Sequence, residues 1–367
     1  MADRRHRTPA RGRRRDRRVY LRRYPVLFTL LAATRRWPAL RLGRTVLVHD
    51  PDGYVEALTR VPLDRLATGT VGGTARRLGT DGLLFDQEGV GHRQTRRSLA
   101  DRLGPAGVAE LRPVWTAVLR QRLAPLRGGA AVDLVPVVAE LAGATTAALL
   151  GVDVDPVALA AAARHAAATA AAEQLPGPRR PGRARVAHRA VTDLAELLGL
   201  PTQRAALAGM LAVAAVNTTV AGIPRAVAWC ADDRLWDAAG DAATRDTLVD
   251  ELLRVTAPSP LLPRVAAGAG TVAGCPVRPG DRLLLVARHA AGAHRSGPDR
   301  AVPAPTRTAR LVFGAGAHSC PGARLARAQL VDVLAALAPY RPVVVSARAD
   351  GRAALPGWAR LVVRAGR

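Results

Sequence analysis

The sequence predicts a mainly α-helical protein with small β-sheets, folded as one domain behind a basic tail. Three observations support this fold class. Apolar residues recur at helical spacing over most of the chain, two short segments alternate like β-hairpins, and no internal repeat is present. The chain has 367 residues and 49% hydrophobic residues, which is enough to bury a large core. We therefore expect a tail over residues 1–23 and a folded domain over 24–367.

The tail carries much of an extreme positive charge. The whole chain has a net charge of +25, and residues 1–23 hold many arginines against only Asp3 and Asp16. A protein this basic can bind nucleic acid, an anionic membrane or an acidic protein partner. Because residues 1–18 show no hydrophobic period, we expect a disordered, solvated tail, with nucleic-acid binding as the less favoured alternative.

The cysteines and the first apolar run indicate the cellular compartment of the protein. Three cysteines, an odd number at wide spacing, argue against a disulfide framework and for a reducing compartment. Cys230 and Cys275 carry no motif, and the histidines show no zinc-ligand spacing. The apolar run 24–33 is too short to span a bilayer. It faintly resembles a twin-arginine export signal but has no convincing cleavage site, so we expect a first helix and a cytoplasmic protein.

The remaining elements follow from periodicity and turn residues. We expect a strand at 44–50 and a Pro/Gly/Arg-rich loop at 175–189. Hairpins are expected at 271–287, turning at Pro279-Gly280, and at 342–364, turning near Asp350-Gly351. Pro224 lies inside the longest helix and should kink it, because proline lacks the N–H that continues the helical ladder. The expected helices are 111–126, 132–152, 157–173, 204–230 and 244–257.

The segment FGAGAHSCPG, residues 313–322, joins a short apolar run to a predicted helix. Gly314 and Gly316 permit positive φ and let a flat ligand lie against the backbone. Gly322 has no side chain, so the following helix can approach the same ligand.

Cys320 stands at the predicted mouth of that helix, with Pro321 suited to the first helical position. There the helix dipole and unpaired amides should favour thiolate over thiol. His318 would donate to an anionic group. A lone cysteine is commonly a core residue, and a Cys-His pair can be a nucleophile and its base, but neither accounts for the glycines. A thiolate beneath a planar, anionic cofactor is what a haem-thiolate centre requires.

Together with Phe313, these residues resemble the haem-binding signature of the cytochrome P450 family at every defining position. The resemblance covers about residues 24–365 and implies the cytochrome P450 fold. It also implies a haem (heme b, iron protoporphyrin IX) whose iron is bound by Cys320. The chain is short for the family, and the deficit falls between the helix at 157–173 and Arg204.

Two further motifs follow in the family's order. ELLR places Glu251 and Arg254 three residues apart on one helix face, the spacing of an ion pair. The resemblance implies that this pair locks to an arginine ahead of the cysteine loop. Arg307 is the expected arginine and Arg300 the alternative.

The resemblance also implies which residues hold the haem propionates. GHRQTRR (91–97) is similar to the family helix in which a His and an Arg four residues later reach them, naming His92 and Arg96. Arg264 resembles a further propionate arginine, and His318 would join them. Cationic donors converging on two carboxylates form strong charge-assisted hydrogen bonds.

The long helix resembles the oxygen-handling helix of the family. The family pattern has an acid before a threonine, whereas AAVNTT places Asn217 before Thr218. Asparagine can hold water but cannot relay a proton by ionising.

The resemblance therefore implies a monomeric haem-thiolate monooxygenase that inserts one atom of O₂ into a small or medium apolar substrate, plausibly in secondary metabolism. Electrons would come from NAD(P)H through ferredoxin reductase and an acidic ferredoxin docking near Arg324 and Arg327. Asn217 leaves open peroxide-driven oxidation or oxidative coupling. The alternative of another class is a basic nucleic-acid- or membrane-binding protein. No transmembrane span is expected.

Overall fold

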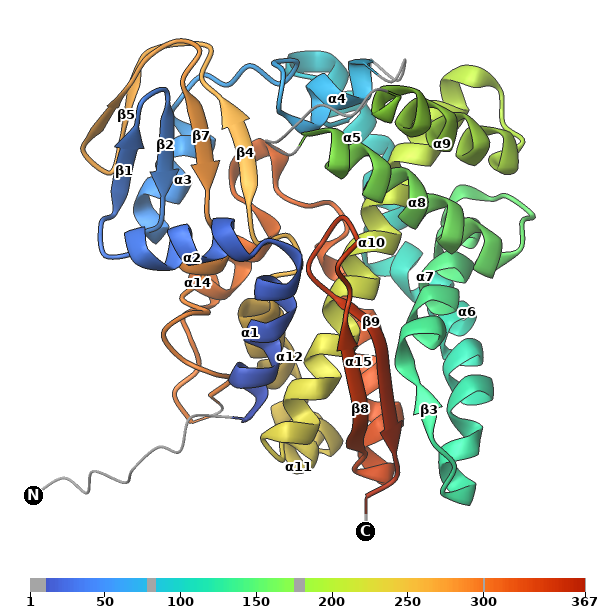
Figure 1. Cartoon of the computed structure of the whole chain (residues 1–367). Helices are drawn as coiled ribbons and strands as arrows, with labels where there is room; N and C mark the ends of the chain where they lie inside the picture. Colours follow the sequence, from blue (N-terminus) through green and yellow to red (C-terminus); the bar gives the residue numbers. More distant parts are fainter. Residues whose placement is uncertain (1–10, 78–83, 175–181, 300, 367) are drawn as a thin grey trace, which may run out of the picture.

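The computed structural model describes residues 11–77, 84–174, 182–299 and 301–366 (Figure 1). The helices are α1 (Arg11–Arg23), α2 (Pro25–Thr34), α3 (Pro51–Thr59), α4 (Val71–Arg77), α5 (Gly89–Leu103), α6 (Pro105–Leu123), η1 (Ala124–Gly128), α7 (Leu134–Leu150), α8 (Pro156–Gln174), α9 (Arg183–Leu198), α10 (Thr202–Asp232), α11 (Trp236–Gly240), α12 (Ala242–Thr256), α13 (Ala287–Ala290), α14 (Thr306–Ala309), η2 (Arg310–Phe313), η3 (Gly316–His318), α15 (Ala323–Leu337) and η4 (Ala338–Tyr340). The strands are β1 (Ala39–Leu42), β2 (Thr45–Val48), β3 (Val132–Asp133), β4 (Leu262–Val265), β5 (Gly270–Val272), β6 (Cys275–Val277), β7 (Arg282–Leu285), β8 (Val343–Ala349) and β9 (Trp358–Arg364).

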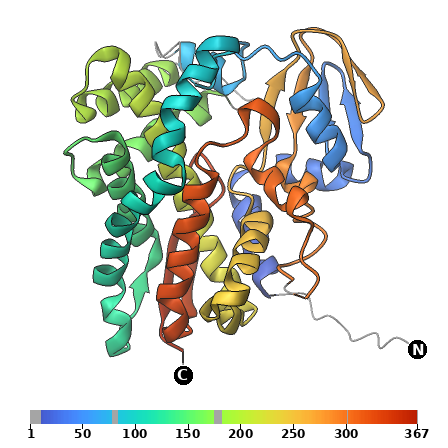
Figure 2. The same cartoon turned by 180° about the vertical axis from the view of Figure 1, so that it is seen from behind.

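Helix α10 runs through the middle of the molecule (Figures 1 and 2). It packs against α7, α8 and α9, and also against α1 and α12. The main hydrophobic core lies around it, with contributions from α6, α7, α8, α12 and α15. Gly143 lets α7 meet α8, because a Cβ there would lie 1.9 Å from the Pro156 carbonyl oxygen. Within the described chain, α10 is also the one helix long and apolar enough to cross a membrane, but its packing is that of a core helix.

A four-stranded sheet in the order β1-β2-β7-β4 forms the second layer at one side. Strands β2 and β7 are parallel, and the other two pairings are antiparallel. A second core, including Val46, Tyr54 and Leu283, lies between this sheet and α3, while Leu31 of α2 packs with Leu47 in a third cluster. The Asp50 carboxylate caps α3 by accepting the Gly53 N–H. Two smaller sheets pair β3-β9-β8 and β5-β6.

The sequence-based helices and the C-terminal hairpin are confirmed. All five expected long helices are present within a few residues of their expected limits, and the apolar run at 24–33 forms α2. Strand β2 and the antiparallel pair β8–β9 also lie where expected. Helix α10 continues past Pro224 to Asp232, and a kink there stays a prediction.

The prediction of a disordered tail is wrong for residues 11–23, which form α1. Asp16, Val19 and Tyr20 are buried, and the Asp16 carboxylate pairs with Arg225 of α10 at 2.7 Å. The Tyr20 hydroxyl donates to the Thr256 carbonyl at 2.6 Å. Only this narrow stripe is buried, so the surrounding arginines conceal the helical period. Residues 1–10 lie outside the described part.

Two further expectations are corrected. The turn at Pro279-Gly280 exists, but the strands beside it belong to different sheets. Strand β6 instead pairs with β5 across Ala273-Gly274, both at positive φ. Strand β7 joins β2 and β4, where Leu283 and Leu285 are buried. The loop expected at 175–189 ends earlier, because α9 begins at Arg183; residues 175–181 lie outside the described part.

Candidate active site

The cysteine loop is held by backbone hydrogen bonds between η2 and α15. The Cys320 N–H donates to the Phe313 carbonyl at 2.8 Å, which closes the loop. Gly314 and Gly316 have φ of 78° and 72°, the left-handed region where glycine is favoured. A Cβ on Gly316 would also lie 3.0 Å from the Thr59 methyl group. The glycines are therefore needed for this loop conformation.

The Cys320 side chain is exposed at the end of this loop. Helix α15 begins three residues later, at Ala323, and a Cβ on Gly322 would lie 3.8 Å from the Cys320 sulfur. The expected bias toward thiolate is not found. Desolvation by the surrounding protein raises the pKa of the Cys320 thiol, and the Gly322 amide and Arg96 only partly oppose it. The protein alone therefore favours the thiol form of Cys320.

The structure brings together the side chains predicted to face an anionic group. His92 of α5 is buried and stacks on His318 with ring centroids 3.8 Å apart. Arg96, one turn later, donates to the Ser319 carbonyl at 2.6 Å, next to Cys320. Burial, followed by repulsion from Arg65, His92, Arg264 and Arg96, lowers the pKa of His318 to about 3. Three arginines, Arg65, Arg96 and Arg264, and the two histidines beside them, His92 and His318, are hereafter the cationic cluster, whose positive charge lies on the arginines.

Among the described residues, the one ion pair formed by the arginines of the cationic cluster is that of Arg65 with Glu88. Arg65 donates to the exposed Glu88 at 3.0 Å. Arg264 of β4 donates to its neighbour Pro263, but its buried Nε–H has no partner within the described residues. Burial and the nearby Arg65 lower the pKa of Arg264. An anion with more than one carboxylate would satisfy this orphaned donor and relieve the repulsion among the cations.

Arg65 is the member of the cationic cluster that the sequence did not predict. It lies in an irregular segment between α3 and α4, with no motif around it. Its side chain is 13% exposed, unusually buried for an arginine in such an arginine-rich chain. The proximity of Arg65 to His318 is seen only in the folded structure, where this segment lies near the cysteine loop.

Glu251 and Arg254 form an ion pair on α12. Both side chains are buried, and the closest N–O distance is 2.6 Å. Arg254 also donates to the Gly297 carbonyl, and the Glu251 carboxylate accepts the amides of Asp299 and Ala304. The pair therefore fixes the irregular segment that leads to the cysteine loop.

The prediction that Arg307 joins the Glu251–Arg254 pair is wrong. Its side chain is exposed on α14, and within the described residues it forms no ion pair with Glu251. The amides of Asp299 and Ala304 already occupy the carboxylate, so no additional cation is required there. The alternative, Arg300, lies outside the described residues.

Asn217 and Thr218 lie near the middle of α10, and both side chains are bound to backbone. The Asn217 amide donates to the Val213 carbonyl at 2.8 Å and to the Ala163 carbonyl of α8 at 3.2 Å. The Thr218 hydroxyl donates to the Ala214 carbonyl at 2.9 Å. Asn217 thus fixes α8 against α10, and its side-chain oxygen is free of any bond within the described part of the chain.

Comparison with solved structures identifies the fold. Open cytochrome P450 EryK from Saccharopolyspora erythraea superposes with a TM-score of 0.73 at 22% identity, covering 94% of this chain and 96% of that one. The chain has the cytochrome P450 fold. CYP109E1 from Bacillus megaterium, solved with testosterone, gives a TM-score of 0.72 at 17% identity over 95% and 100% of the two chains. CalO2 gives 0.72 at 20% identity over 94% and 97%.

Sequence similarity to characterised proteins is more local. Erythromycin C-12 hydroxylase from Saccharopolyspora erythraea is 39% identical over 99 residues, which span 25% of this chain and 24% of that protein. No protein-family model matches the chain. The cytochrome P450 fold implies a haem-iron cofactor, and the cationic cluster beside an exposed cysteine fits a planar dianion with a metal at its centre. The fold does not favour a basic nucleic-acid- or membrane-binding protein.

Proposed function

We propose that this protein is a cytochrome P450 monooxygenase that inserts one atom of O₂ into an apolar organic molecule. The observation that carries the proposal is the position of the exposed Cys320 beside the cationic cluster. One arginine of this cluster, Arg264, has a buried donor without a partner in the described part of the chain. Cys320 would hold the haem iron, while His92, Arg96, Arg264, His318 and Arg65 would hold the propionates. Bound haem would supply the activation of O₂ that side chains alone cannot provide.

The residues of this chain then have separate tasks. Phe313, Gly314, Gly316 and Gly322 shape the loop that presents the cysteine. Glu251 and Arg254 fix the segment before it. Asn217 and Thr218 would order water along α10 and pass protons toward the reacting oxygen. Their acceptor oxygens remain available for this, although their donors are bound to backbone.

The electron source and the partners are part of the same proposal. We expect NAD(P)H to reduce a ferredoxin reductase and then an acidic ferredoxin in the cytoplasm. Arg324, exposed on α15 just after the cysteine loop, supports docking of an acidic protein there. Arg327 contributes less charge than its position suggests, because it pairs with Asp250 at 2.6 Å.

The substrate class is inferred from similar proteins. Structures with this fold include a mutant of cytochrome P450 EryK in complex with erythromycin B and CYP109E1 in complex with testosterone. A small or medium apolar intermediate of secondary metabolism is therefore the proposed substrate.

Turnover under ¹⁸O₂ tests the reaction. Candidate substrates are first selected by the spectral shift that they cause in the haem-loaded protein, and then incubated with NADPH, ferredoxin reductase and ferredoxin. The proposal expects product carrying one ¹⁸O atom. Product that carries oxygen only from water, or substrates that bind and are never oxygenated, would contradict it.

A further inference from the structure

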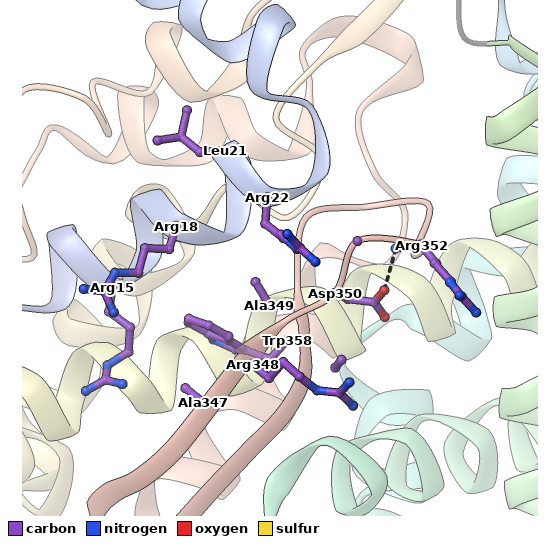
Figure 3. Close-up of a pocket in the computed structure, with 12 residues that line it drawn as sticks. Arg15, Arg18, Leu21, Arg22, Ala347, Arg348, Ala349, Asp350, Arg352 and Trp358 are labelled. Atoms are coloured by element: carbon purple, nitrogen blue, oxygen red, sulfur yellow. Dashed lines mark hydrogen bonds between the residues drawn. The ribbon is translucent and has the colours of Figure 1, made fainter.

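A groove lined by arginines lies on the side of α1, apart from the cationic cluster (Figure 3). Its volume is about 1080 Å³. Helix α1 forms one wall, and the β8–β9 hairpin with its connecting loop forms the other. The two segments are far apart in sequence, at opposite ends of the chain. A hollow of this size is at the upper end of the range for small-molecule sites.

The charge on the walls is strongly positive. Arg15, Arg18 and Arg22 lie on one face of α1 at spacings of three and four residues. Arg348 and Arg352 line the opposite wall. Five arginines therefore border the groove, against a single acidic lining residue, Asp350.

Four of these arginines have no acidic partner in the part of the chain that the structure describes. Arg15 pairs with Asp232 at 2.5 Å, while Arg18, Arg22, Arg348 and Arg352 make no ion pair within the residues that the structure describes. Asp350 does not neutralise them. Its carboxylate accepts the backbone amides of Arg352 and Ala353 and faces Arg164 at 3.7 Å.

The groove is pre-formed, because hydrogen bonds fix both of its walls. Arg23 and Tyr24, at the end of α1, donate to the Ala353 and Ala354 carbonyls of the hairpin loop. The two walls also lie close together at this end, since a Cβ on Gly351 would be 3.8 Å from the Arg22 Nε. A pre-formed site loses little conformational entropy when a ligand binds.

Between the arginines the lining is apolar. Leu21, Ala347, Ala349 and Trp358 contribute, and the buried Trp358 indole N–H has no hydrogen-bond partner within the described part of the chain. Figure 3 shows the arginines spread along the groove rather than meeting at one point. This arrangement matches a ligand whose negative groups are separated by an uncharged organic part.

We propose that this groove binds an organic polyphosphate of about nucleotide or dinucleotide size. Arginine suits phosphate because its planar fork donates two parallel hydrogen bonds to two oxygens. The apolar lining would contact the uncharged part of the ligand. The site is separate from the proposed oxygenation chemistry, and it would make the protein responsive to a phosphorylated metabolite.

Binding of a fluorescent ATP analogue to the full-length protein tests the proposal by anisotropy. The variant Arg18→Gln/Arg348→Gln removes one cation from each wall. The matched control, Arg14→Gln/Arg17→Gln, removes two exposed arginines of α1 that do not line the groove. We expect the groove variant to weaken binding about 10- to 100-fold and the control to change it by less than about threefold. Equal weakening in both variants, or no binding by the wild type at about 1 mM, would overturn the proposal.

Competition separates the ligand classes. Unlabelled ATP should displace the probe better than inorganic triphosphate, because only ATP has the organic part. A poly-glutamate peptide that displaces the probe better than ATP would overturn the proposal in favour of an acidic protein segment. ATP should change the tryptophan fluorescence of the wild type, because Trp358 lines the groove. Trp358→Phe should lose this change; an unchanged signal would place the ligand elsewhere.

Discussion

The Asp16 carboxylate of α1 lies 2.7 Å from the Arg225 guanidinium of α10, and both side chains are buried. Arg288 also reaches Asp16, at 3.4 Å, and the Tyr20 hydroxyl accepts a hydrogen bond from Arg225. Arg225 directly follows Pro224, where the helical ladder of α10 lacks one donor. Helix α1 therefore supplies the buried carboxylate that pairs with Arg225, next to the position where α10 lacks a backbone donor.

Asp16→Asn should lower the free energy of unfolding by about 3–5 kcal/mol, because it leaves Arg225 buried without a counter-charge. Chemical denaturation measures the loss. Arg17→Gln, at the exposed neighbouring position, is the control and should change stability by less than about 0.5 kcal/mol. Similar stability of both variants would show that α1 is not needed to hold α10.

Three neighbouring histidines make stability depend on pH. The Nδ1 atoms of His49 and His289 lie 2.8 Å apart, and His294 packs against His289. The His49 Nε2 lies 3.1 Å from the Thr34 hydroxyl, which itself donates to the Leu30 carbonyl. His49 Nε2 is therefore the donor to Thr34, and His289 donates to the His49 Nδ1. This arrangement requires the His49 ring to be neutral, because its Nδ1 accepts a hydrogen bond.

Burial contributes most to the pKa shifts of these histidines. The pKa of His49 and of His294 is lowered to about 4, and that of His289 is lowered further. The unfolded chain binds protons at these positions below about pH 6.5, and the folded chain does not. The contribution of the histidines to stability is thus complete above pH 6.5 and is lost as the pH falls toward 4.

His294→Gln removes one of these titrating groups. Its stability should fall less steeply between pH 6.5 and 4 than that of the wild type, as measured by urea denaturation at several pH values. The carboxylates that titrate in the same range are common to both proteins and cancel in the comparison. Parallel pH profiles would contradict the neutral-histidine arrangement.

Arg264→Gln should weaken haem retention about tenfold or more, because Arg264 supplies a buried donor that has no partner among the described residues. Arg307→Gln removes the same charge from an exposed position and should retain haem like the wild type. The rate of haem transfer to an excess of an apo-haem-protein acceptor measures both. Equal rates for the two variants would contradict the assignment of the cationic cluster to the propionates.

Thr218→Ala should divert reducing equivalents into free peroxide, because it removes the hydroxyl that we propose orders water on α10. Asn217→Asp should lower the free energy of unfolding by about 1–3 kcal/mol, because a carboxylate cannot donate to the Val213 and Ala163 carbonyls. NADPH consumed, peroxide released and product formed are measured together. Unchanged coupling in Thr218→Ala would show that its hydroxyl serves only the helix.

Local sequence predicted the features that depend on local chemistry. The glycines at 314 and 316 were expected because their backbone conformations require them, and the i, i+3 spacing paired Glu251 with Arg254. Other features depend on contacts between distant segments. Arg65 meets His318 only through tertiary packing, and the partners of Glu251 are backbone amides, which no side-chain pattern reveals.

The same reason explains the other corrections. The buried stripe of α1 consists of Gly12, Asp16, Val19 and Tyr20, and Asp16 pairs with Arg225, 209 residues away. The pairing of β7 with β2 could not be read from the turn beside it, because the register is set by the apolar face of a strand from the other end of the chain.

The central claim is that Cys320 binds the haem iron as a thiolate, and the spectrum of the ferrous–CO adduct tests it most directly. The wild type and Cys275→Ser, the control at a half-buried cysteine of β6, should both show the long-wavelength Soret band of thiolate ligation. Cys320→Ser should lose that band. A wild-type protein that takes up no haem, or a Cys320→Ser protein that keeps the long-wavelength band, would contradict the account.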